Sequence, residues 1–538
     1  MDLKINIIIK NAILVLAVSL VSCNRVSTEI YNPIVGKGRY ILTPPTPETP
    51  QINGAEVFGV RPSHPFLYTI AATGVRPMTF AAEGLPEGLK LDEETGIISG
   101  IITSDALQNY IVTLKAINAK GTATRTLEIM VGEEICLTPP LGWNSWNCWG
   151  DAVTQENVEN SAKAMYEKGL VNYGWTYVNI DDGWQADERG GEFHAILSDP
   201  VKFPDMQGMC NRIHAMGMKV GIYSTPWVTS YAHRIGGSSR NPQGLWDKSM
   251  VDKKGTDKNA RTFWSVGEYK FDTNDAKQWA EWGIDYLKYD WYLNEAESTI
   301  RMAKALRASG RDIVFSLSNS CPIELEPVCR EYAQVWRTTG DLKDSWNKKI
   351  HHKNICDVLP LHRQWVNEVF EAKAGHFPDP DMLVVGHQNR GRSKEMTPSL
   401  LTADEQYSHI ALWSLWSAPL LIGCPVERFD DFTLALLTNS EVLAIQQDRL
   451  ATPGKSVKYD EKQEIIVKPL HNGNVAVGMF NMSEATDTIT IDWETIGVEG
   501  VQQLRDAWRQ ENIGKYEDAF SAAVPSHGNV LLIMSKEE

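Results

Sequence analysis

The stretch that decides the fold is Asp285-Tyr-Leu-Lys-Tyr-Asp-Trp291. Its Tyr and Leu residues favour a strand, and Gly283 punctuates the chain just before them, so we predict a buried strand that ends on a carboxylate. Lys288 and Asp290 are two residues apart, so in a strand their side chains point the same way. Burying these two charged groups costs free energy, so we expect them to form an ion pair or to take part in a reaction. A lone Asp here would more simply be a turn or cap residue, but the pattern recurs along the chain.

Length and composition limit the class of protein. The chain has 538 residues, which predicts roughly three domains. It is 43% hydrophobic and 22% charged, as is typical of a folded protein. The net charge of −16 argues against a nucleic-acid partner. The 18 Trp residues suit stacking on sugar rings, although Trp is also common in protein cores.

Residues 1–23 resemble an export signal. Lys4 and Lys10 precede an apolar run, residues 11–22, that is too short to span a bilayer. The run ends Leu20-Val-Ser-Cys23, which resembles a bacterial lipobox, in which Cys23 becomes the lipidated N-terminus. We therefore expect an exported, lipid-anchored protein in the periplasm or on the outer surface of a bacterium. The alternative is a soluble secreted protein with an incidental cysteine.

Cysteine usage gives little further information. Seven cysteines remain after Cys23, so at least one is unpaired even in an oxidising compartment. Cys321 and Cys329 are the closest pair in sequence, and Cys136 and Cys148 are the next closest. Spacing alone does not decide whether either pair forms a bridge. No CxxC motif or His cluster indicates a metal site, and we expect no cofactor.

The first quarter of the chain is predicted to lack catalytic residues. Residues 24–50 end in a Pro-rich run, typical of an extended spacer. Residues 51–133 show alternating strand-like runs with Gly-containing turns, which predict an all-β module. Within them, Gly84–Asp92 and Thr95–Gly100 resemble the immunoglobulin-like modules of bacterial secreted enzymes. A spacer role and a sugar-binding role are both open, and we favour the spacer.

Residues 134–452 change character, because strand-like runs now alternate with segments of helical periodicity. The predicted strands are Leu141–Trp146, Tyr177–Asp182, Lys219–Ser224, Asp285–Asp290, Asp312–Ser318, Val335–Asp341, Met382–Val385 and Pro419–Gly423. Eight such units in roughly 300 residues predict a (β/α)8 TIM barrel. A doubly wound sheet is the alternative, but no glycine-rich phosphate turn follows the first strand. Residues 453–538 are predicted to form an antiparallel β-sandwich.

Chemistry-bearing residues gather where the barrel strands are predicted to end, which is where such barrels hold their active sites. They are Trp143, Trp146, Asp181, Asp182, Tyr223, Lys288, Asp290, Arg337 and Asp341, with Asp379-Pro-Asp-Met382 at the start of the seventh strand. Two inward carboxylates with aromatic walls suit glycosidic bond hydrolysis. Lys288 is expected to hold Asp290 ionised, whereas Asp341 would need a raised pKa from desolvation and the charge of Asp290.

The residues on either side of the expected reaction centre suit a sugar. Asp181 and Asp182 are expected to accept hydrogen bonds from sugar hydroxyls, since carboxylates are acceptors. Trp146 is expected to stack on the apolar face of a sugar ring.

Residues 137 to about 535 resemble glycoside hydrolase family 27 of the α-galactosidase clan. The matching stretches are Thr138–Trp146, Asn179–Trp184, Gly221–Tyr223, Tyr286–Asp290, Trp336-Arg337, Asp341–Trp346 and Asp379–Leu383. The resemblance implies a TIM barrel followed by a β-sandwich, and hydrolysis with retained configuration and no metal. It implies that Asp290 is the nucleophile and Asp341 the acid/base. It also implies a galactose pocket made of Trp146, Asp181, Asp182, Tyr223, Lys288, Arg337, Asp381 and Met382.

Two departures from the family bear on the site. Trp291-Tyr292 stands where many members have a residue and then a Cys, so the disulfide of those members is absent. Ser318-Asn319-Ser320 stands where members have Cys-Glu-Trp, whose Glu recognises the sugar 2-position. We expect Asn319 to act at that position instead. N-acetylgalactosamine and β-L-arabinopyranose therefore stay open as glycones beside galactose, since specificity rests on few contacts.

The sequence thus predicts an exported exo-glycosidase that acts on terminal α-galactosyl residues of a carbohydrate. The alternative from another class is a non-catalytic glycan-binding lipoprotein on the same barrel. Both proteins would need Trp146 and the Asp181-Asp182 pair. Only an enzyme needs Lys288, Asp290, Arg337 and Asp341 together, and all four are present.

Overall fold

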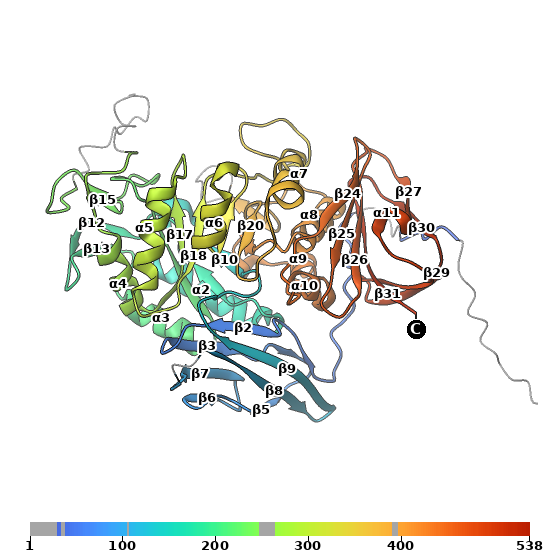
Figure 1. Ribbon diagram of the computed structural model, residues 1–538, viewed down its shortest axis with the longest axis horizontal. Helices are drawn as coiled ribbons and strands as arrows, with labels where there is room; N and C mark the ends of the chain where they lie inside the picture. The colour runs from blue at the N-terminus through green and yellow to red at the C-terminus, as the bar shows by residue number, and fades with distance from the viewer. Residues whose placement is uncertain (1–28, 34–37, 105–106, 247–263, 390–395, 538) are drawn as a thin grey trace, which may run out of the picture.

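The computed structural model describes residues 29–33, 38–104, 107–246, 264–389 and 396–537. Figure 1 shows three parts in chain order: a β module, a central barrel and a C-terminal β-sandwich. The predicted signal segment, residues 1–23 with Cys23, lies outside the described residues. Within the described ranges, no helix has the length and apolar character that crossing a membrane requires.

The central part is a closed barrel of eight parallel strands, as predicted. In chain order the strands are β10 (Leu141–Asn144), β11 (Tyr177–Asn179), β14 (Lys219–Ser224), β17 (Ile284–Asp290), β18 (Val314–Ser318), β19 (Val335–Arg337), β20 (Phe377–Asp379) and β23 (Leu420–Ile422). The first strand pairs with the eighth. A parallel bridge from Leu383 to Ile422 joins the seventh strand's continuation to the eighth and closes the ring.

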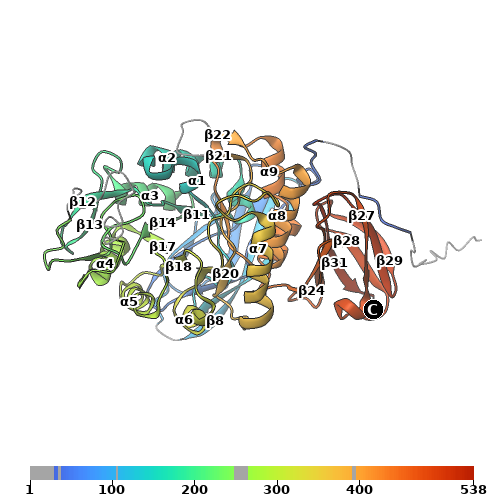
Figure 2. The same ribbon diagram turned by 90° about the horizontal axis from the view of Figure 1, so that it is seen from above.

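Helices surround this ring, as Figure 2 shows from above. They are α2 (Gln155–Glu167), α3 (Met206–Ala215), α4 (Asp272–Trp282), α5 (Ala296–Arg307), α6 (Glu326–Tyr332), α7 (Ile355–Arg363), α8 (Ala403–Leu415), α9 (Asp431–Leu437) and α10 (Ser440–Gln446). Their starts follow local chemistry: a capping box between Thr154 and Asn157 opens α2. In α5 the buried residues Thr299, Met302, Ala303 and Leu306 recur at helical spacing and face the strands.

The predicted position of the seventh strand, Met382–Val385, is wrong. The strand is β20, Phe377–Asp379, five residues earlier by its first residue. Pro378 in its middle hid the strand, because Pro cannot donate to a sheet. The hydrogen bonds between this strand and the chain on either side of β19 use the N–H of Phe377 and the C=O of Asp379. Pro378 lacks an N–H group, but neither hydrogen bond needs one from it. As a result Asp381 follows a strand end, like the other site residues.

The N-terminal module is a β-sandwich, as predicted. One sheet contains β2 (Val57–Val60), β9 (Gly121–Val131), β8 (Gln108–Asn118) and β5 (Thr79–Glu83), and the other contains β3 (Pro65–Thr69), β7 (Ile97–Ile101) and β6 (Leu89–Leu91). The module lies against the N-terminal ends of the barrel strands (Figure 1). Arg61 and His64 contact the Asp312 carboxylate at 3.1 and 2.8 Å, and Thr69 donates to the carbonyl of Gly217 at 2.8 Å.

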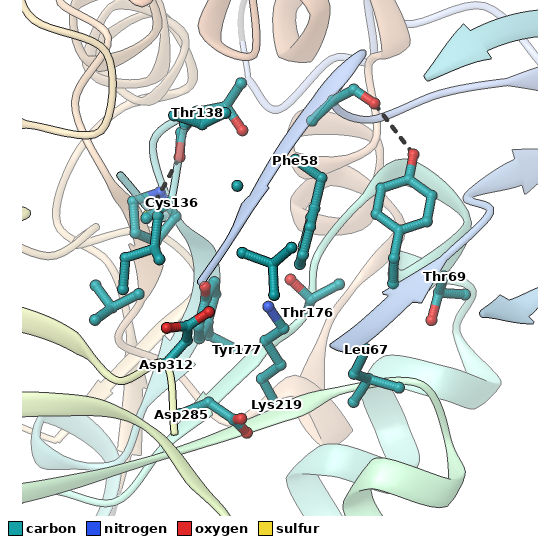
Figure 3. Close-up of a pocket in the computed structure, with 18 of the residues that line it drawn as sticks. Phe58, Leu67, Thr69, Cys136, Thr138, Thr176, Tyr177, Lys219, Asp285 and Asp312 are labelled. Atoms are coloured by element: carbon teal, nitrogen blue, oxygen red, sulfur yellow. Dashed lines mark hydrogen bonds between the residues drawn. The ribbon is translucent and has the colours of Figure 1, made fainter. Parts of the chain in front are cut away.

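A cavity of about 300 Å³ lies between the module and the barrel (Figure 3). The Lys219 ammonium lies 4.5 Å from the ring centre of Phe58 on one side of it. Asp285, which also lines the cavity, pairs with Arg311 at 2.6 Å. Lys219 begins β14 and Asp285 lies at the start of β17, whereas the predicted site residues lie at the opposite strand ends. This cavity is therefore distinct from the predicted site.

The Pro-rich segment is extended, as expected, but its described residues do not form a free spacer. The Tyr40 hydroxyl donates to Asp404, and its ring stacks on Tyr407 with centroids 5.7 Å apart. Thr43 donates to the carbonyl of Ala435 at 2.8 Å. Tyr31 forms a parallel bridge with Ala522 in the C-terminal sandwich. The described residues of the segment therefore contact both the barrel and the C-terminal sandwich.

The C-terminal part is an antiparallel sandwich, as predicted. Its larger sheet contains β24 (Lys455–Tyr459), β25 (Gln463–Pro469), β26 (Val475–Asn481), β31 (Asn529–Lys536), β28 (Gln502–Asp506) and β29 (Glu511–Tyr516), and β27 (Asp487–Asp492) pairs with β30 (Ala519–Val524). The larger sheet packs against α8. His527 contacts Glu405 at 2.8 Å, and the buried Lys468 ammonium donates to Ser417 at 2.6 Å.

All seven described cysteines are free thiols. The Sγ atoms of Cys321 and Cys329 lie 3.2 Å apart, so the chain brings the closest sequence pair together. Cys136 contacts the carbonyl of Thr138, whereas Cys148 contacts the carbonyl of Gly423.

We expect a chain that begins at Glu134 to keep its kcat/KM on a small aryl glycoside but to melt at a lower temperature. The contacts of Arg61 and His64 with Asp312 and of Thr69 with Gly217 lie at the strand ends opposite the predicted site, so their loss should lower stability and spare turnover. The truncation also removes the contacts of Tyr40 and Thr43 with Asp404 and Ala435. Steady-state kinetics and a thermal melt measure the two effects. A fragment that still melts cooperatively but has lost turnover would show that the module contributes to the site.

Candidate active site

The predicted site residues come together at the C-terminal ends of the barrel strands. Two cations join them. The Lys288 ammonium lies 2.8 Å from Asp181, which links the ends of β17 and β11. The Arg337 guanidinium lies 2.7 Å from Asp381 and 3.6 Å from Asp341. The parallel register explains this convergence, since each of these residues lies near the C-terminal end of a barrel strand.

Lys288 pairs with Asp181 and not, as expected, primarily with Asp290. Burial lowers the pKa of Lys288, but the negative charges of Asp181 and Asp290 outweigh burial and raise it above its ordinary value. The ammonium also lies 5.7 Å from the ring centre of Tyr223. Lys288 is therefore a fixed positive charge between two carboxylates.

Asp290 is buried, with 7% of its surface exposed. Desolvation raises the pKa of its carboxyl to about 7, although the positive charge of Lys288 opposes the shift. The Asn319 amide donates a hydrogen bond to its Oδ1 at 2.5 Å, which favours the charged form. Asn319 holds this position with a φ of 79°, in the left-handed region that Asn tolerates better than most residues. The positive charge of Lys288 therefore does not fully offset the effect of burial on the pKa of Asp290.

Asp341 has the opposite environment, because its side chain is 48% exposed. Partial burial raises its pKa, but the positive charges of Arg337 and then Lys288 outweigh burial and lower the pKa below the ordinary value. The expected raised pKa of Asp341 is thus wrong for the free protein. The negative charge of Asp341 in turn contributes to the raised pKa of Asp290.

The other predicted residues differ in how exposed they are and in the hydrogen bonds that they form. Trp146 is half-buried at the rim, where a sugar face can reach it, and Met382 donates its N–H to Asp381 at 2.7 Å. Tyr223 is fully buried, and its hydroxyl has no hydrogen-bond partner in the described part of the chain. Asp182 is also buried, and burial raises its pKa to about 6.

Both oxygens of Asp182 already accept hydrogen bonds from the protein. Ser230 and Gln185 donate to Oδ1 at 2.9 and 3.2 Å, and the N–H of Ala232 donates to Oδ2 at 2.7 Å. A carboxylate has roughly four acceptor positions, so few are left for a sugar. Asp182 therefore also anchors the loop that follows β14, a role that its sequence position did not indicate.

Sequence reasoning missed Tyr231, which lies in that loop. Burial, and then the negative charges of Asp290 and Asp341, raise the pKa of the Tyr231 phenol. Its ring packs against Trp227 and Trp264, with centroids 5.2 and 5.3 Å apart. The local concentration of aromatic residues was the available signal, but nothing in the sequence placed this loop over the strand ends.

The arrangement suits acid–base and nucleophilic chemistry on a sugar. It supplies one buried carboxylate, one half-exposed carboxylate and two fixed cations around them. Across the described ranges, no group of three or more His, Cys, Asp or Glu side chains is arranged to hold a metal ion.

Comparisons with known proteins agree with this geometry. Residues 138–238 and 250–448 match the family model "Alpha galactosidase A", residues 460–534 match "Alpha galactosidase C-terminal beta sandwich domain", and residues 43–132 match an Ig domain model. A "probable alpha-galactosidase" of Dictyostelium discoideum is 34% identical over 74% of this chain and 93% of its own length. The alpha-galactosidase of Cyamopsis tetragonoloba is 31% identical over 74% and 86%.

A solved structure resembles the whole architecture. It is the crystal structure of a "putative alpha-galactosidase" from Bacteroides fragilis, which is 32% identical. The match covers 94% of this chain and 100% of that one, with a TM-score of 0.79.

We expect Asn319→Ala to raise the apparent pKa of the acid limb of kcat/KM. The amide stabilises the charged form of Asp290, so its loss favours the protonated form and moves the limb to higher pH. The shift should be about one pH unit, or ~1.4 kcal/mol, near the lower end of the range for one hydrogen bond to a charged group. A pH–rate profile measures it. An Asn319→Asp variant, which puts a carboxylate in place of the donor, should shift the limb further; an unchanged limb in both would contradict this role.

Proposed function

This chain belongs to the alpha-galactosidase family and is an alpha-galactosidase of glycoside hydrolase family 27, and we propose that Asp290 is its nucleophile and Asp341 its acid/base. One observation carries the assignment of roles. Asp290 is buried on a strand beside a fixed cation, whereas Asp341 is half-exposed at the mouth, where a leaving group must depart. A nucleophile needs a fixed position, and an acid/base must exchange protons with a leaving group and then with water.

The reaction follows in two displacements. Asp290 attacks the anomeric carbon of a terminal α-galactosyl residue while Asp341 gives its proton to the glycosidic oxygen, so the leaving group departs neutral. Water then attacks the same carbon as Asp341 takes its proton and the Asp290 ester bond breaks. Two inversions leave the configuration unchanged. This route requires the two carboxyl groups to lie about 5–5.5 Å apart, which stays a prediction.

The proton must lie on Asp341 when the reaction begins, although the free protein favours it on Asp290. Substrate binding supports the reversal, because an aglycone covers the exposed part of Asp341 and desolvation raises its pKa. Lys288 and the Asn319 amide then hold the negative charge on Asp290. The substrate thereby sets the protonation order that its own cleavage needs.

The glycone contacts follow from the same groups. Asp181 and Asp381, held by Lys288 and Arg337, present acceptor oxygens to sugar hydroxyls, and Trp146 offers a ring face. Asn319 was expected to read the sugar 2-position, and its amide N–H group is committed to Asp290. Its carbonyl oxygen is the part left for the sugar, so one residue would serve both the nucleophile and the 2-position.

Replacing the two carboxylates one at a time separates their roles. We expect Asp290→Ala to lower kcat by roughly 10⁴-fold or more even on aryl galactosides with excellent leaving groups, because no glycosyl-enzyme forms. Asp341→Ala should be far less harmful on those substrates, since they need little protonation. Azide should rescue Asp341→Ala with the α-azide as product and Asp290→Ala with the β-azide.

Polarimetry or NMR of the rescued products identifies the anomers. The same anomer from both variants, or the reverse assignment, would overturn the proposal. Glu167→Ala provides a control, because this exposed carboxylate ends α2 on the outside of the barrel and should leave kcat unchanged.

We also propose that the protein is exported and lipid-anchored through Cys23, in the periplasm or on the outer surface of a bacterium. The support comes from the N-terminal sequence, in which charged residues are followed by an apolar run that ends in Leu20-Val-Ser-Cys23. In a bacterial host that processes lipoproteins, the chain should incorporate labelled palmitate and sediment with membranes. A Cys23→Ser chain should do neither. Equal labelling and sedimentation of the two chains would contradict the proposal.

A further inference from the structure

A basic segment follows the half-exposed carboxylate of Asp341. This segment, the basic loop, is Leu342-Lys-Asp-Ser-Trp-Asn-Lys-Lys-Ile-His-His-Lys353. It carries four lysines and two histidines against one acidic residue, Asp344. The whole chain has a net charge of −16, so the sign of the charge reverses at this point of the surface.

The lysines of the basic loop have no close ion-pair partner among the residues that the structure describes. None of Lys343, Lys348, Lys349 and Lys353 forms an ion pair with another residue that the structure describes. Asp344 is buried and accepts from the N–H of Leu400 at 2.9 Å. Glu484 from the sandwich accepts from the Asn347 amide at 2.9 Å and not from a lysine. Clustered like charges repel, so an unpaired cluster costs stability unless something outside the chain neutralises it.

The basic loop also encloses space. A hollow of about 570 Å³ is lined by Gly340, Asp341, Asn347, Lys349, Ile350, His351, His352, Lys353, Asn354 and Asp357. The proposed acid/base and the basic side chains therefore face one hollow. Asp357 is the other carboxylate on its wall.

Backbone hydrogen bonds fix this hollow against Asp341. The N–H of Lys353 donates to the carbonyl of Asp341, and the N–H of Lys343 donates to the carbonyl of Lys353, both at 2.9 Å. The start and end of the basic loop are thus clamped together beside the carboxylate. An ordinary solvated charge run has no such clamp and shares no hollow with a reactive group.

The position beside Asp341 identifies what the hollow receives. An acid/base protonates the oxygen of the leaving group, so the leaving group lies on its side of the scissile bond. We propose that the leaving group carries an anion, a carboxylate or a sulfate ester, on or next to the sugar that follows the scissile bond. This inference rests on the role of Asp341 given above. The substrate class is then an acidic glycan capped by α-galactose.

The lysines supply the positive charge at neutral pH. Burial, and then the neighbouring charge of Lys343, lower the pKa of His352, which leaves that imidazole neutral. Attraction between lysines and an exposed anion is screened by salt, so a preference for anionic substrates must weaken as ionic strength rises.

Matched substrates test the proposal on the full chain. Three aryl α-galactosides share one phenol framework: the galactoside of 3-(4-hydroxyphenyl)propanoate, that of the corresponding amide, and that of the sulfate ester of 3-(4-hydroxyphenyl)propanol. Their side chains insulate the phenol oxygen from the charged group. At low salt we expect kcat/KM to be roughly tenfold higher for an anionic substrate than for the amide, as for one charge-assisted contact. The anion that gives the larger ratio identifies the group.

Variants separate this inference from the function on which it rests. Lys349→Gln/Lys353→Gln should bring the ratio close to one and leave kcat/KM for the amide unchanged. Lys90→Gln/Lys163→Gln, on exposed surfaces elsewhere, should keep the ratio. Equal kcat/KM for all three substrates at low salt, or a preference that the first double variant keeps, would overturn the inference while the amide is still cleaved. Failure to cleave all three would instead overturn the proposed function, and this inference with it.

Discussion

The site depends on two cations placed among more carboxylates than they can neutralise. Lys288 and Arg337 share the strand ends with Asp181, Asp182, Asp290, Asp341, Asp379 and Asp381. Such a cluster is costly to bury unless protons are retained, and burial raises the pKa of both Asp290 and Asp379 to about 7. Retained protons are what acid–base chemistry uses. The electrostatic cost of the site and its reactivity therefore have one origin.

The fold makes this charge cluster possible because the stabilising ion pairs and the reacting groups lie at opposite ends of the barrel. The N-terminal ends of the strands pack on the β module, where Asp285 and Asp312 are paired with Arg311 and Arg61. There, opposite charges match and serve as structural contacts. At the C-terminal ends, the single positive charge of Lys288 lies beside both Asp181 and Asp290. Because this charge does not offset the burial of Asp290, the pKa of that reacting carboxyl group stays raised. The same strand, β17, carries a balanced ion pair at its start and an unbalanced one at its end.

Periodicity and residue type predicted the barrel and the two β parts, because alternating strand and helix patterns depend on local sequence. Pro378 hid one strand, since sequence does not show which N–H groups a sheet needs. The two-residue spacing predicted that Lys288 and Asp290 lie on one face of the strand. It did not predict that the Lys288 ammonium donates a hydrogen bond to the Asp181 carboxylate. The protonation order was predicted the wrong way round for the free protein, because it depends on the exposed fraction of Asp341, a tertiary property. Tyr231 and the contacts of the Pro-rich segment were missed for the same reason.

The central claim is that Asp290 carries the sugar between the two displacements. Incubation of the full chain with 5-fluoro-α-D-galactosyl fluoride, which forms a glycosyl-enzyme that turns over slowly, followed by proteolysis and mass spectrometry, tests it most directly. We expect one added fluorogalactosyl group per chain, as an ester on the peptide that contains Asp290. An ester on Asp341, Asp181 or Asp381, or turnover with no covalent adduct, would contradict it.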